Sequence, residues 1–413
     1  MKLVCVECKA EGHWRDYRIS CSCGGRMEVQ QELSGLDGER LKALFRERLA
    51  ERMSAYASGV WRYKELILPD LPEEHIVTKY EGNTGLYTSE PIREMLGIRA
   101  LHFKAQSENP SGSFKDNGMT AAISHGLALG YKRFACASTG NTSSSLAMYA
   151  AMAGCTSQVF VPSRSVSPNK VRQTLAYGAQ VVRFDGTYDD GIRFLERHGE
   201  ELGLYVCNSV NPFRIEGQKS IVFEIAQALG WELPDWILIP GGALSNVSAL
   251  GKGLEELYHL GMIARLPRIA LIQAEGASPF HRMMAEGREE LIPEPNPFTV
   301  ASALNIGNPP SWKVARRGLQ LCQGVTCSVT DEEIMAAKRI IDRSGIGCEP
   351  ASAATLAGLL KLLNDGTIGR DERALCILTG NLLKDTDILD ETADALSHAE
   401  LTVEAVKKSI VMA

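Results

Sequence analysis

Short apolar runs alternate with longer amphipathic segments along the chain from residue 99 onward. The apolar runs predict β-strands at Ala100–Ala105, Arg133–Ser138, Gln158–Pro162, Gln180–Asp185, Leu204–Asn208, Trp236–Pro240, Arg268–Gln273 and Ala374–Leu378. The segments between them predict helices at Met119–Leu129, Thr142–Ala153, Asn169–Tyr177, Gly191–Leu202, Glu216–Leu229 and Asn246–Leu260. Apolar strands that alternate with helices are typical of a largely parallel sheet covered on both faces. The pattern therefore predicts an α/β fold, in which ligands bind in loops after the carboxyl ends of strands.

The first 98 residues follow a different pattern. Residues 36–57 have leucines and Phe45 on one side of a helical wheel, which predicts a charged amphipathic helix. The segment Trp61–Asp70 has no clear period and is interpreted as a connector. A turn at Glu81–Leu86 precedes a short predicted helix that ends near Gly97.

Four cysteines lie in the first 30 residues, at Cys5, Cys8, Cys21 and Cys23. A CxxC pair followed by CxC and two glycines resembles a zinc ribbon, in which thiolate pairs on two tight turns bind the metal. The second pair is one residue shorter than usual, so a structural zinc site and a ribbon that no longer binds metal both remain open. In either case residues 1–30 are interpreted as an appended module and not as the catalytic centre.

The composition narrows the class of protein. The 413 residues are 45% hydrophobic and 23% charged, which is typical of a globular chain with a substantial core. A net charge of −6 argues against nucleic acid or an anionic membrane surface as a partner. Since no apolar run approaches the length of a membrane span, we expect a cytoplasmic protein. The seven cysteines outside the module lie singly in apolar segments and are interpreted as reduced core residues.

The loop Ser107–Gly118 carries the first candidate for chemistry. It is built of Ser, Asn, Pro and Gly and delivers Lys115 to the start of an apolar helix. Backbone donors followed by a lysine at a helix N-terminus suit an anion or an electrophile, and the helix dipole disfavours protonation of the amine. For a lone lysine, the simpler interpretation is a solvated side chain in the first turn.

Polar, glycine-rich loops follow three other predicted strands. They are Ser138–Ser145, Gly241–Asn246 and Thr379–Asn381, and the first two open helices whose N-termini suit a carboxylate or a phosphate. No GxGxxG, HExxH or GxSxG motif is present. A small molecule that carries a phosphate and reacts with an amine fits this set of loops. Pyridoxal 5'-phosphate has both properties.

The motifs Asn109–Asp116, Ala137–Ser143 and Leu378–Gly380 resemble those of the threonine synthases, which are pyridoxal-phosphate enzymes of the tryptophan-synthase β-like fold (fold type II). The resemblance covers about residues 78–390. It implies two open, twisted, largely parallel sheet domains together with the small zinc-ribbon-like N-terminal module. The expected parts are the module at residues 1–30, a large cofactor-binding domain at 31–108 and 215–413, and a small domain at 109–214. A homodimer is expected from the family.

The resemblance also implies roles for individual residues. Lys115 would be the Schiff-base and acid–base residue, Asn141 would bind the 3'-oxygen of the cofactor, and Thr379 would be the neutral partner of its ring nitrogen. The cofactor phosphate would bind Gly241, Gly242, Ala243, Leu244, Ser245 and Asn246. The substrate carboxylate would bind Ser138, Thr139 and Thr142, and the substrate phosphate Asn211 and Arg214, with Lys170 as a weaker addition. For Arg214 the alternative is a surface arginine at a helix start.

The expected reaction is the conversion of O-phospho-L-homoserine and water to L-threonine and phosphate. Matches at Asn208–Lys219, Ile306–Pro309 and Glu349–Ala354 favour it. Asn117 and Asn305 stand where family members often have arginine, and these departures favour a relative with another substrate. Such a relative would be a β-replacement synthase on O-phosphoserine that forms cysteine or cysteate, or a threonine/serine dehydratase. A protein from another class, a catalytically silent metabolite-binding regulator, is a further alternative.

Overall fold

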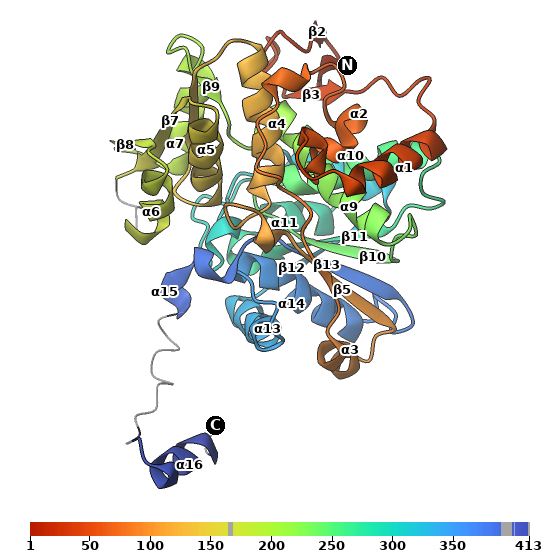
Figure 1. The fold of residues 1–413 in the computed structure, drawn as a ribbon, viewed down its shortest axis with the longest axis vertical. Coiled ribbons are helices and arrows are strands. Elements are labelled where there is room, and N and C mark those ends of the chain that lie inside the picture. Colours follow the sequence, from red (N-terminus) through yellow and green to blue (C-terminus); the bar gives the residue numbers. More distant parts are fainter. Residues whose placement is uncertain (164–167, 390–398, 400, 412–413) are drawn as a thin grey trace.

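The computed structural model describes residues 1–163, 168–389, 399 and 401–411, and it contains three β-sheets (Figure 1). Each sheet draws its strands from one of the three parts predicted above. The α/β prediction with largely parallel sheets is therefore confirmed. The boundaries between the three parts stay a prediction.

The largest sheet has the strand order β12-β11-β10-β13-β5-β4. Its strands are β4 (Leu86–Tyr87), β5 (Ala100–Ala105), β10 (Trp236–Pro240), β11 (Arg268–Ala274), β12 (Val325–Val329) and β13 (Arg373–Leu378). All neighbours are parallel except β4 with β5. The carboxyl ends of β5, β10 and β13 therefore meet at one edge of the sheet, as the sequence analysis required.

The second sheet has four parallel strands in the order β8-β7-β6-β9. They are β6 (Arg133–Ala137), β7 (Thr156–Pro162), β8 (Gln180–Phe184) and β9 (Tyr205–Val206). The strands alternate the side chains that they direct to the two faces. Phe134 and Cys136 pack in one apolar cluster, and Ala135 and Ala137 pack in another.

Helices surround both sheets (Figure 1). Their bounds are α1 Gly38–Glu47, α2 Lys64–Ile67, α3 Glu90–Leu96, α4 Lys115–Ala128, α5 Asn141–Met152, α6 Pro168–Ala176, α7 Tyr188–His198, α8 Pro212–Gln218, α9 Ser220–Ala228, α10 Ser245–His259, α11 Pro279–Ala285, α12 Trp312–Leu321, α13 Asp331–Arg343, α14 Pro350–Asn364, α15 Thr386–Leu389 and α16 Val403–Val411. Among the described residues, none of these helices is both long and apolar enough to cross a membrane.

Residues 2–30 form a small antiparallel sheet in the order β2-β1-β3. The strands are β1 (Lys2–Cys5), β2 (Glu11–His13) and β3 (Met27–Gln30). We call residues 1–30 the ribbon. It lies against the body of the protein beside α4 and α10 (Figure 1), and its Leu3 and Val29 join the same core cluster as residues of the large sheet.

Three details of the secondary structure differ from the prediction. The helix predicted at residues 36–57 ends at Glu47, and only short 3-10 turns follow it. The helix predicted at Glu216–Leu229 is two helices, α8 and α9, which meet at Lys219. The predicted connector Trp61–Asp70 is mostly buried, with Trp61 and Leu66 fully enclosed.

Candidate active site

Lys115 is the first residue of α4, directly after the loop that leaves β5. Its ammonium nitrogen lies 3.8 Å from the centroid of the Phe114 ring. Burial and, to a smaller extent, the charge of Arg214 lower the pKa of Lys115 to about 7, while the Glu349 charge acts in the opposite direction. An amine with this pKa is substantially unprotonated at neutral pH, which is the form that attacks an aldehyde or accepts a proton. Lys115 is half-buried, and with this pKa it differs from an ordinary solvated lysine.

The loop that carries Lys115 is joined to the loop after β13. The Phe114 N–H donates to the Thr379 carbonyl at 2.9 Å, and the Asn381 N–H donates to the Gly112 carbonyl at 2.9 Å. An antiparallel bridge lies between these two bonds. The lysine and the predicted partner of the ring nitrogen are therefore fixed relative to each other by backbone hydrogen bonds.

Glu349 was not assigned to the site by the sequence analysis, and it lies between two predicted cofactor residues. Its Oε2 accepts a hydrogen bond from Asn141 Nδ2 at 2.9 Å, and its Oε1 accepts one from the Thr379 hydroxyl at 3.2 Å. The Thr379 hydroxyl also lies 3.0 Å from the Ser352 hydroxyl. Glu349 is 2% exposed, and burial raises its pKa. Asn141 begins α5 beside the four-stranded sheet, and Thr379 follows β13 of the largest sheet. Glu349 therefore links the parts of the site that the two sheets contribute.

The loop Gly241–Asn246 joins β10 to α10. The Gly241 N–H donates to the Ile272 carbonyl at 2.7 Å, so the sheet already uses this donor and it is not free for a phosphate. Within the described part of the chain, the N–H groups of residues 242–246 have no protein acceptor, and the Asn246 side-chain amide nitrogen is buried without a partner. A Cβ on Gly242 would lie 2.6 Å from the Ala303 carbonyl oxygen, so only glycine fits there. These free donors at the start of a 15-residue helix form a cradle of the kind that binds phosphate.

The loop after β6 contains the predicted carboxylate-binding residues. Asn208 fixes its beginning, because the Asn208 amide accepts from the Ala137 N–H at 3.0 Å and donates to the Ala137 carbonyl at 2.9 Å. The Ser138 hydroxyl is used within the loop and accepts from the Gly140 N–H at 3.2 Å. Thr139 and Thr142 are half-buried, and their hydroxyls make no hydrogen bond to any residue that the structure describes. Thr139 and Thr142 are therefore the hydroxyls that remain free for a ligand.

Arg214 and Asn211, predicted together as phosphate ligands, have different surroundings. Arg214 is fully buried, and its Nη1 donates to the Cys207 carbonyl at 2.9 Å, whereas Nε and Nη2 have no partner among the described residues. The Asn211 side chain caps α8: its Oδ1 accepts from the N–H groups of Phe213 and Arg214, and its Nδ2 donates to the Val206 carbonyl. Arg214 is therefore not a surface arginine, and the amide of Asn211 caps α8, whereas the assignment of the two residues to the substrate phosphate stays a prediction.

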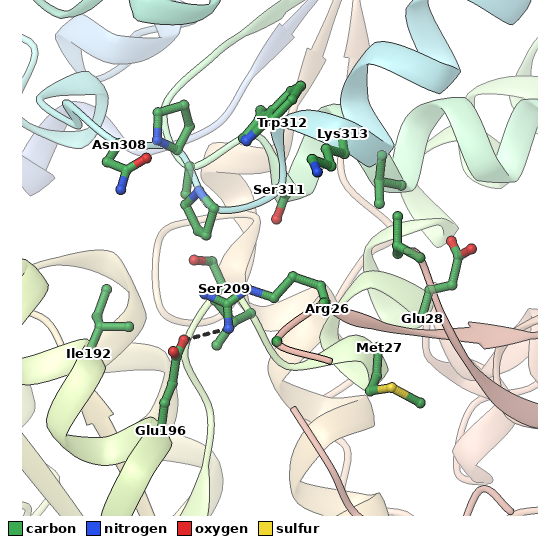
Figure 2. A pocket seen from close by; sticks show the side chains of 18 of the residues that line it. Arg26, Met27, Glu28, Ile192, Glu196, Ser209, Asn308, Ser311, Trp312 and Lys313 are labelled. Carbon is green, nitrogen blue, oxygen red and sulfur yellow. Dashed lines mark hydrogen bonds and ion pairs between the residues drawn. The ribbon is translucent and has the colours of Figure 1, made fainter. Parts of the chain in front are cut away.

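A cavity of about 480 Å³ opens beside the phosphate cradle (Figure 2). Its wall includes Ala243 from the cradle and Ser209, whose buried hydroxyl has no partner in the described part of the protein. The ribbon contributes Arg26, α7 contributes Glu196, and Trp312 comes from the opposite side. This cavity provides space for a small ligand next to the cradle and the residues before α8.

Three other positions that the sequence singled out are Lys170, Asn117 and Asn305. The Lys170 side chain lies outside the described residues. Asn117 lies within α4, where its Nδ2 donates to the Ser220 hydroxyl at 2.8 Å, so its amide contributes to a helix contact. Asn305 is exposed and follows a short 3-10 turn.

Two ionisable residues beside the site were not predicted, the buried Asp116 and the half-buried Lys384. Asp116 accepts hydrogen bonds from the Ser111 N–H at 2.6 Å and from the Ser145 hydroxyl at 2.5 Å, and it braces the lysine loop against α5. Lys384 donates to Gln173 Oε1 at 2.6 Å and joins the segment after β13 to α6. Adjacency to Lys115 was the available sequence signal for Asp116, and no comparable signal marks Lys384.

The site can be compared with known proteins. Residues 77–380 match the family described as "Pyridoxal-phosphate dependent enzyme". The chain is 40% identical to a threonine synthase of Methanosarcina acetivorans over 99% of this chain and 98% of the relative. It is 39% identical to a threonine synthase of Methanocaldococcus jannaschii, over 98% of each chain.

Solved structures share the fold. The crystal structure of threonine synthase from Escherichia coli matches with a TM-score of 0.74 at 15% identity, covering 99% of this chain and 94% of that one. A maize serine racemase matches with a TM-score of 0.65 at 20% identity, over 82% of this chain and 98% of the other. At these identities the two structures support the fold alone. Taken with the family match and the full-length relatives, they show that the chain belongs to the pyridoxal-phosphate dependent enzyme family and, within it, to the threonine synthases.

Proposed function

We propose that the protein is a threonine synthase, which uses pyridoxal 5'-phosphate to convert O-phospho-L-homoserine and water to L-threonine and phosphate. The relatives that match over nearly the whole chain support this function. When bound, the cofactor supplies an aldehyde that captures the substrate amine and a ring that withdraws electrons from the carbon atoms beside it. The free cradle donors at residues 242–246 fit the cofactor phosphate.

The observation that carries the choice of substrate is the guanidinium of Arg214. It is fully buried, and two of its nitrogens lack a partner among the described residues. An unpaired buried cation is costly unless a ligand neutralises it, and a phosphate matches its planar set of donors. The charge of Arg214 also acts on Lys115, so an anion bound there would lie close to the reacting amine. We therefore assign Arg214, with the free hydroxyl of Ser209, to the phosphate of the substrate.

Lys115 is assigned to proton transfer as well as to cofactor attachment. A pKa of about 7 lets the same amine accept a proton from the α-carbon and return one later, because neither form is strongly favoured at neutral pH. The contact with the Phe114 ring restricts where the amine can lie.

The remaining ligands are assigned by position. Asn141 and Thr379 are proposed to hold the cofactor ring, with Glu349 fixing the orientation of both through its two carboxylate oxygens. Thr139 and Thr142 are proposed to hold the substrate carboxylate at the start of α5, where the helix dipole favours an anion. Ser138 would support them through its bond to the loop backbone.

The setting of the enzyme is also proposed. The cysteines are all unpaired, which supports a reducing compartment and hence the cytoplasm. We keep the homodimer that the family resemblance suggests as a prediction, which light scattering on the purified protein tests.

The function is tested with a panel of substrates. Purified protein is supplied with phosphohomoserine, with phosphoserine together with sulfide or sulfite, or with threonine, and phosphate, amino-acid products and keto acids are measured. We expect phosphate and threonine in equal amounts from phosphohomoserine, and no turnover in Lys115→Ala. Faster turnover of phosphoserine, or of threonine to a keto acid, would instead support the replacement synthase or the dehydratase.

A further inference from the structure

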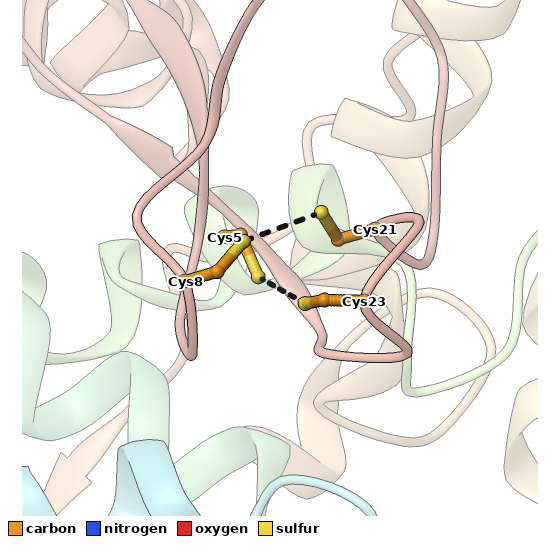
Figure 3. Close-up of side chains that lie close together, drawn as sticks. All are labelled: Cys5, Cys8, Cys21 and Cys23. Carbon is orange, nitrogen blue, oxygen red and sulfur yellow. Dashed lines mark hydrogen bonds between the residues drawn. The ribbon is translucent and has the colours of Figure 1, made fainter.

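We propose that Cys5, Cys8, Cys21 and Cys23 bind one zinc ion. We further propose that this zinc holds the ribbon in its position against the four-stranded sheet and the helices of the largest sheet. The four sulfur atoms lie within 4.8 Å of one another (Figure 3). Cys5 Sγ lies 3.5 Å from Cys23 Sγ, and Cys8 Sγ lies 3.6 Å from Cys21 Sγ. Four thiolates at about 2.3 Å from a central zinc are separated by about 3.8 Å, whereas disulfide sulfurs are separated by about 2.05 Å. The sulfur positions therefore fit a tetrahedral metal site and not two disulfides.

The backbone around the cysteines is shaped to hold this arrangement. Each pair is followed by a residue in the left-handed region, Lys9 with φ 61° and Gly24 with φ 86°. The Gly25 N–H points to Cys23 Sγ at 3.4 Å, and a Cβ on Gly25 would lie 2.8 Å from Cys5 Sγ. The second turn thus brings its backbone close to one sulfur of each pair, and the shortened CxC spacing does not prevent the four thiols from converging.

The ribbon contacts the four-stranded sheet and the helices around it. The Tyr17 hydroxyl donates to the Val206 carbonyl at 2.8 Å in β9, and the Tyr17 ring stacks on Tyr205. His125 in α4 bonds to the Trp14 carbonyl at 2.9 Å. These contacts attach the ribbon to the strand and the helix that flank the site on one side.

The ribbon also contacts the helices of the large sheet. Gln31, directly after β3, donates to Glu216 in α8 at 2.7 Å, and Lys252 in α10 bonds both to Glu216 and to the Val29 carbonyl. Glu216 is fully buried and lies two residues after Arg214 in α8. The ribbon is therefore attached to the helix that carries the proposed phosphate ligand.

The ribbon is too small to hold this position through its own core. Segments below about 40 residues usually need a metal, disulfides or a partner to fold. Zinc binding would supply that stability, because the free energy of binding adds to the free energy of folding. Zinc at the tip would then keep β1 and β3 in place, and with them the wall that Arg26 and Met27 give to the cavity. This coupling rests on the proposed function of Arg214, whereas the metal site does not.

The metal site is tested on the full-length enzyme with its cofactor bound. Elemental analysis should find about one zinc per chain, and an organomercurial that titrates four thiols should release it in proportion. Cys8→Ser and Cys21→Ser should each lose the zinc, whereas Cys155→Ser, which changes a thiol outside the cluster, should keep it. A wild-type protein purified under reducing conditions that contains no zinc, contains iron instead, or shows the four cysteines paired as disulfides by mass spectrometry would overturn the proposal.

The coupling is tested separately by hydrogen–deuterium exchange on zinc-loaded and zinc-stripped wild-type enzyme. We expect faster exchange in residues 2–30 and also in α8, with α14 unchanged as an internal control. Faster exchange confined to residues 2–30 would refute the coupling and leave the metal site standing. Since exchange is independent of turnover, a failure of the proposed reaction would not be confused with either result.

Discussion

Arg214→Met is expected to separate function from stability. Phosphate binding would give the guanidinium up to two further charge-assisted hydrogen bonds, each worth about 1.5–3 kcal/mol. Loss of both corresponds to about 3–6 kcal/mol of transition-state stabilisation, a fall in kcat/KM of roughly 10²- to 10⁴-fold. A variant that lost this much activity through damage to the fold would also lose stability, whereas Arg214→Met should not lose stability.

In the ligand-free protein, Arg214→Met should not lower the free energy of unfolding, in contrast to its effect on kcat/KM. Arg214 is 0% exposed, and among the described residues its side chain has a single partner, the Cys207 carbonyl. Its removal costs about 1–3 kcal/mol for the unsatisfied carbonyl but relieves a desolvation penalty of several kcal/mol for the buried charge. The free energy of unfolding of Arg214→Met should therefore equal or exceed that of the wild type.

The measurements are phosphate release across a range of phosphohomoserine concentrations and urea unfolding of the cofactor-free protein. Arg193→Met is a matched control, because Arg193 lines the same cavity but its side chain is 57% exposed and pairs with Asp190. It should change kcat/KM by less than about tenfold, the range expected for a screened surface charge. If Arg214→Met lost stability and kept its kcat/KM, Arg214 would be a structural residue and the assignment of the substrate phosphate would fail.

Three further predictions test the surroundings of the site. Glu349→Gln removes a charge that raises the pKa of Lys115, so the pKa of that amine should fall. We also expect kcat to fall about 10- to 100-fold, because one charge-assisted hydrogen bond to Asn141 is lost. A variant with the kcat of the wild type would contradict the role of Glu349. Burial lowers the pKa of His125 to about 3, below its unfolded value of about 6.5, so the contribution of His125 to the free energy of unfolding should fall by about 2 kcal/mol from pH 7 to pH 5. Urea unfolding should show this change in the difference between the wild type and His125→Gln, because other groups that titrate in this range, such as Asp116, are common to both. Gly242→Ala places a Cβ 2.6 Å from the Ala303 oxygen and should weaken cofactor affinity about tenfold or more in a spectroscopic titration, unless the cradle does not contact the cofactor phosphate.

Most strands of the two parallel sheets were predictable because they form short apolar runs, and β12, which was missed together with β4, shows the limit of that signal. In β12 (Val325–Val329), threonine and serine alternate with valine and cysteine, and the strand lies at the edge of the sheet with only part of its side chains buried. No continuous apolar run marks it. Trp61–Asp70 fails for the opposite reason, because an irregular segment that is enclosed on most sides has no periodic exposure to water.

The site was predictable where it depends on strand ends and unpredictable where it depends on contacts across the fold. Parallel strands bring their carboxyl ends to one edge, so the loops with Lys115 and Thr379 could be placed together from the sequence. Glu349 precedes Pro350 at the start of α14, which the sequence suggests is a capping position. In the structure its side chain makes no capping bond and turns to Asn141 at the start of α5 instead, a contact across the fold that the local sequence does not indicate.

The departures from the family pattern affect the substrate only if those side chains face it. Asn117 bonds to Ser220 between α4 and α9, and the neighbouring backbones are so close that a Cβ on Gly217 would lie 2.0 Å from the Asn117 carbonyl oxygen. A longer side chain at residue 117 would have to enter this contact, so the asparagine is explained by helix packing. Asn305 is exposed to solvent, where a charge is screened and contributes little to binding. The structural reason to prefer another substrate is therefore weak at both positions, and recognition of the phosphate depends chiefly on the buried guanidinium of Arg214.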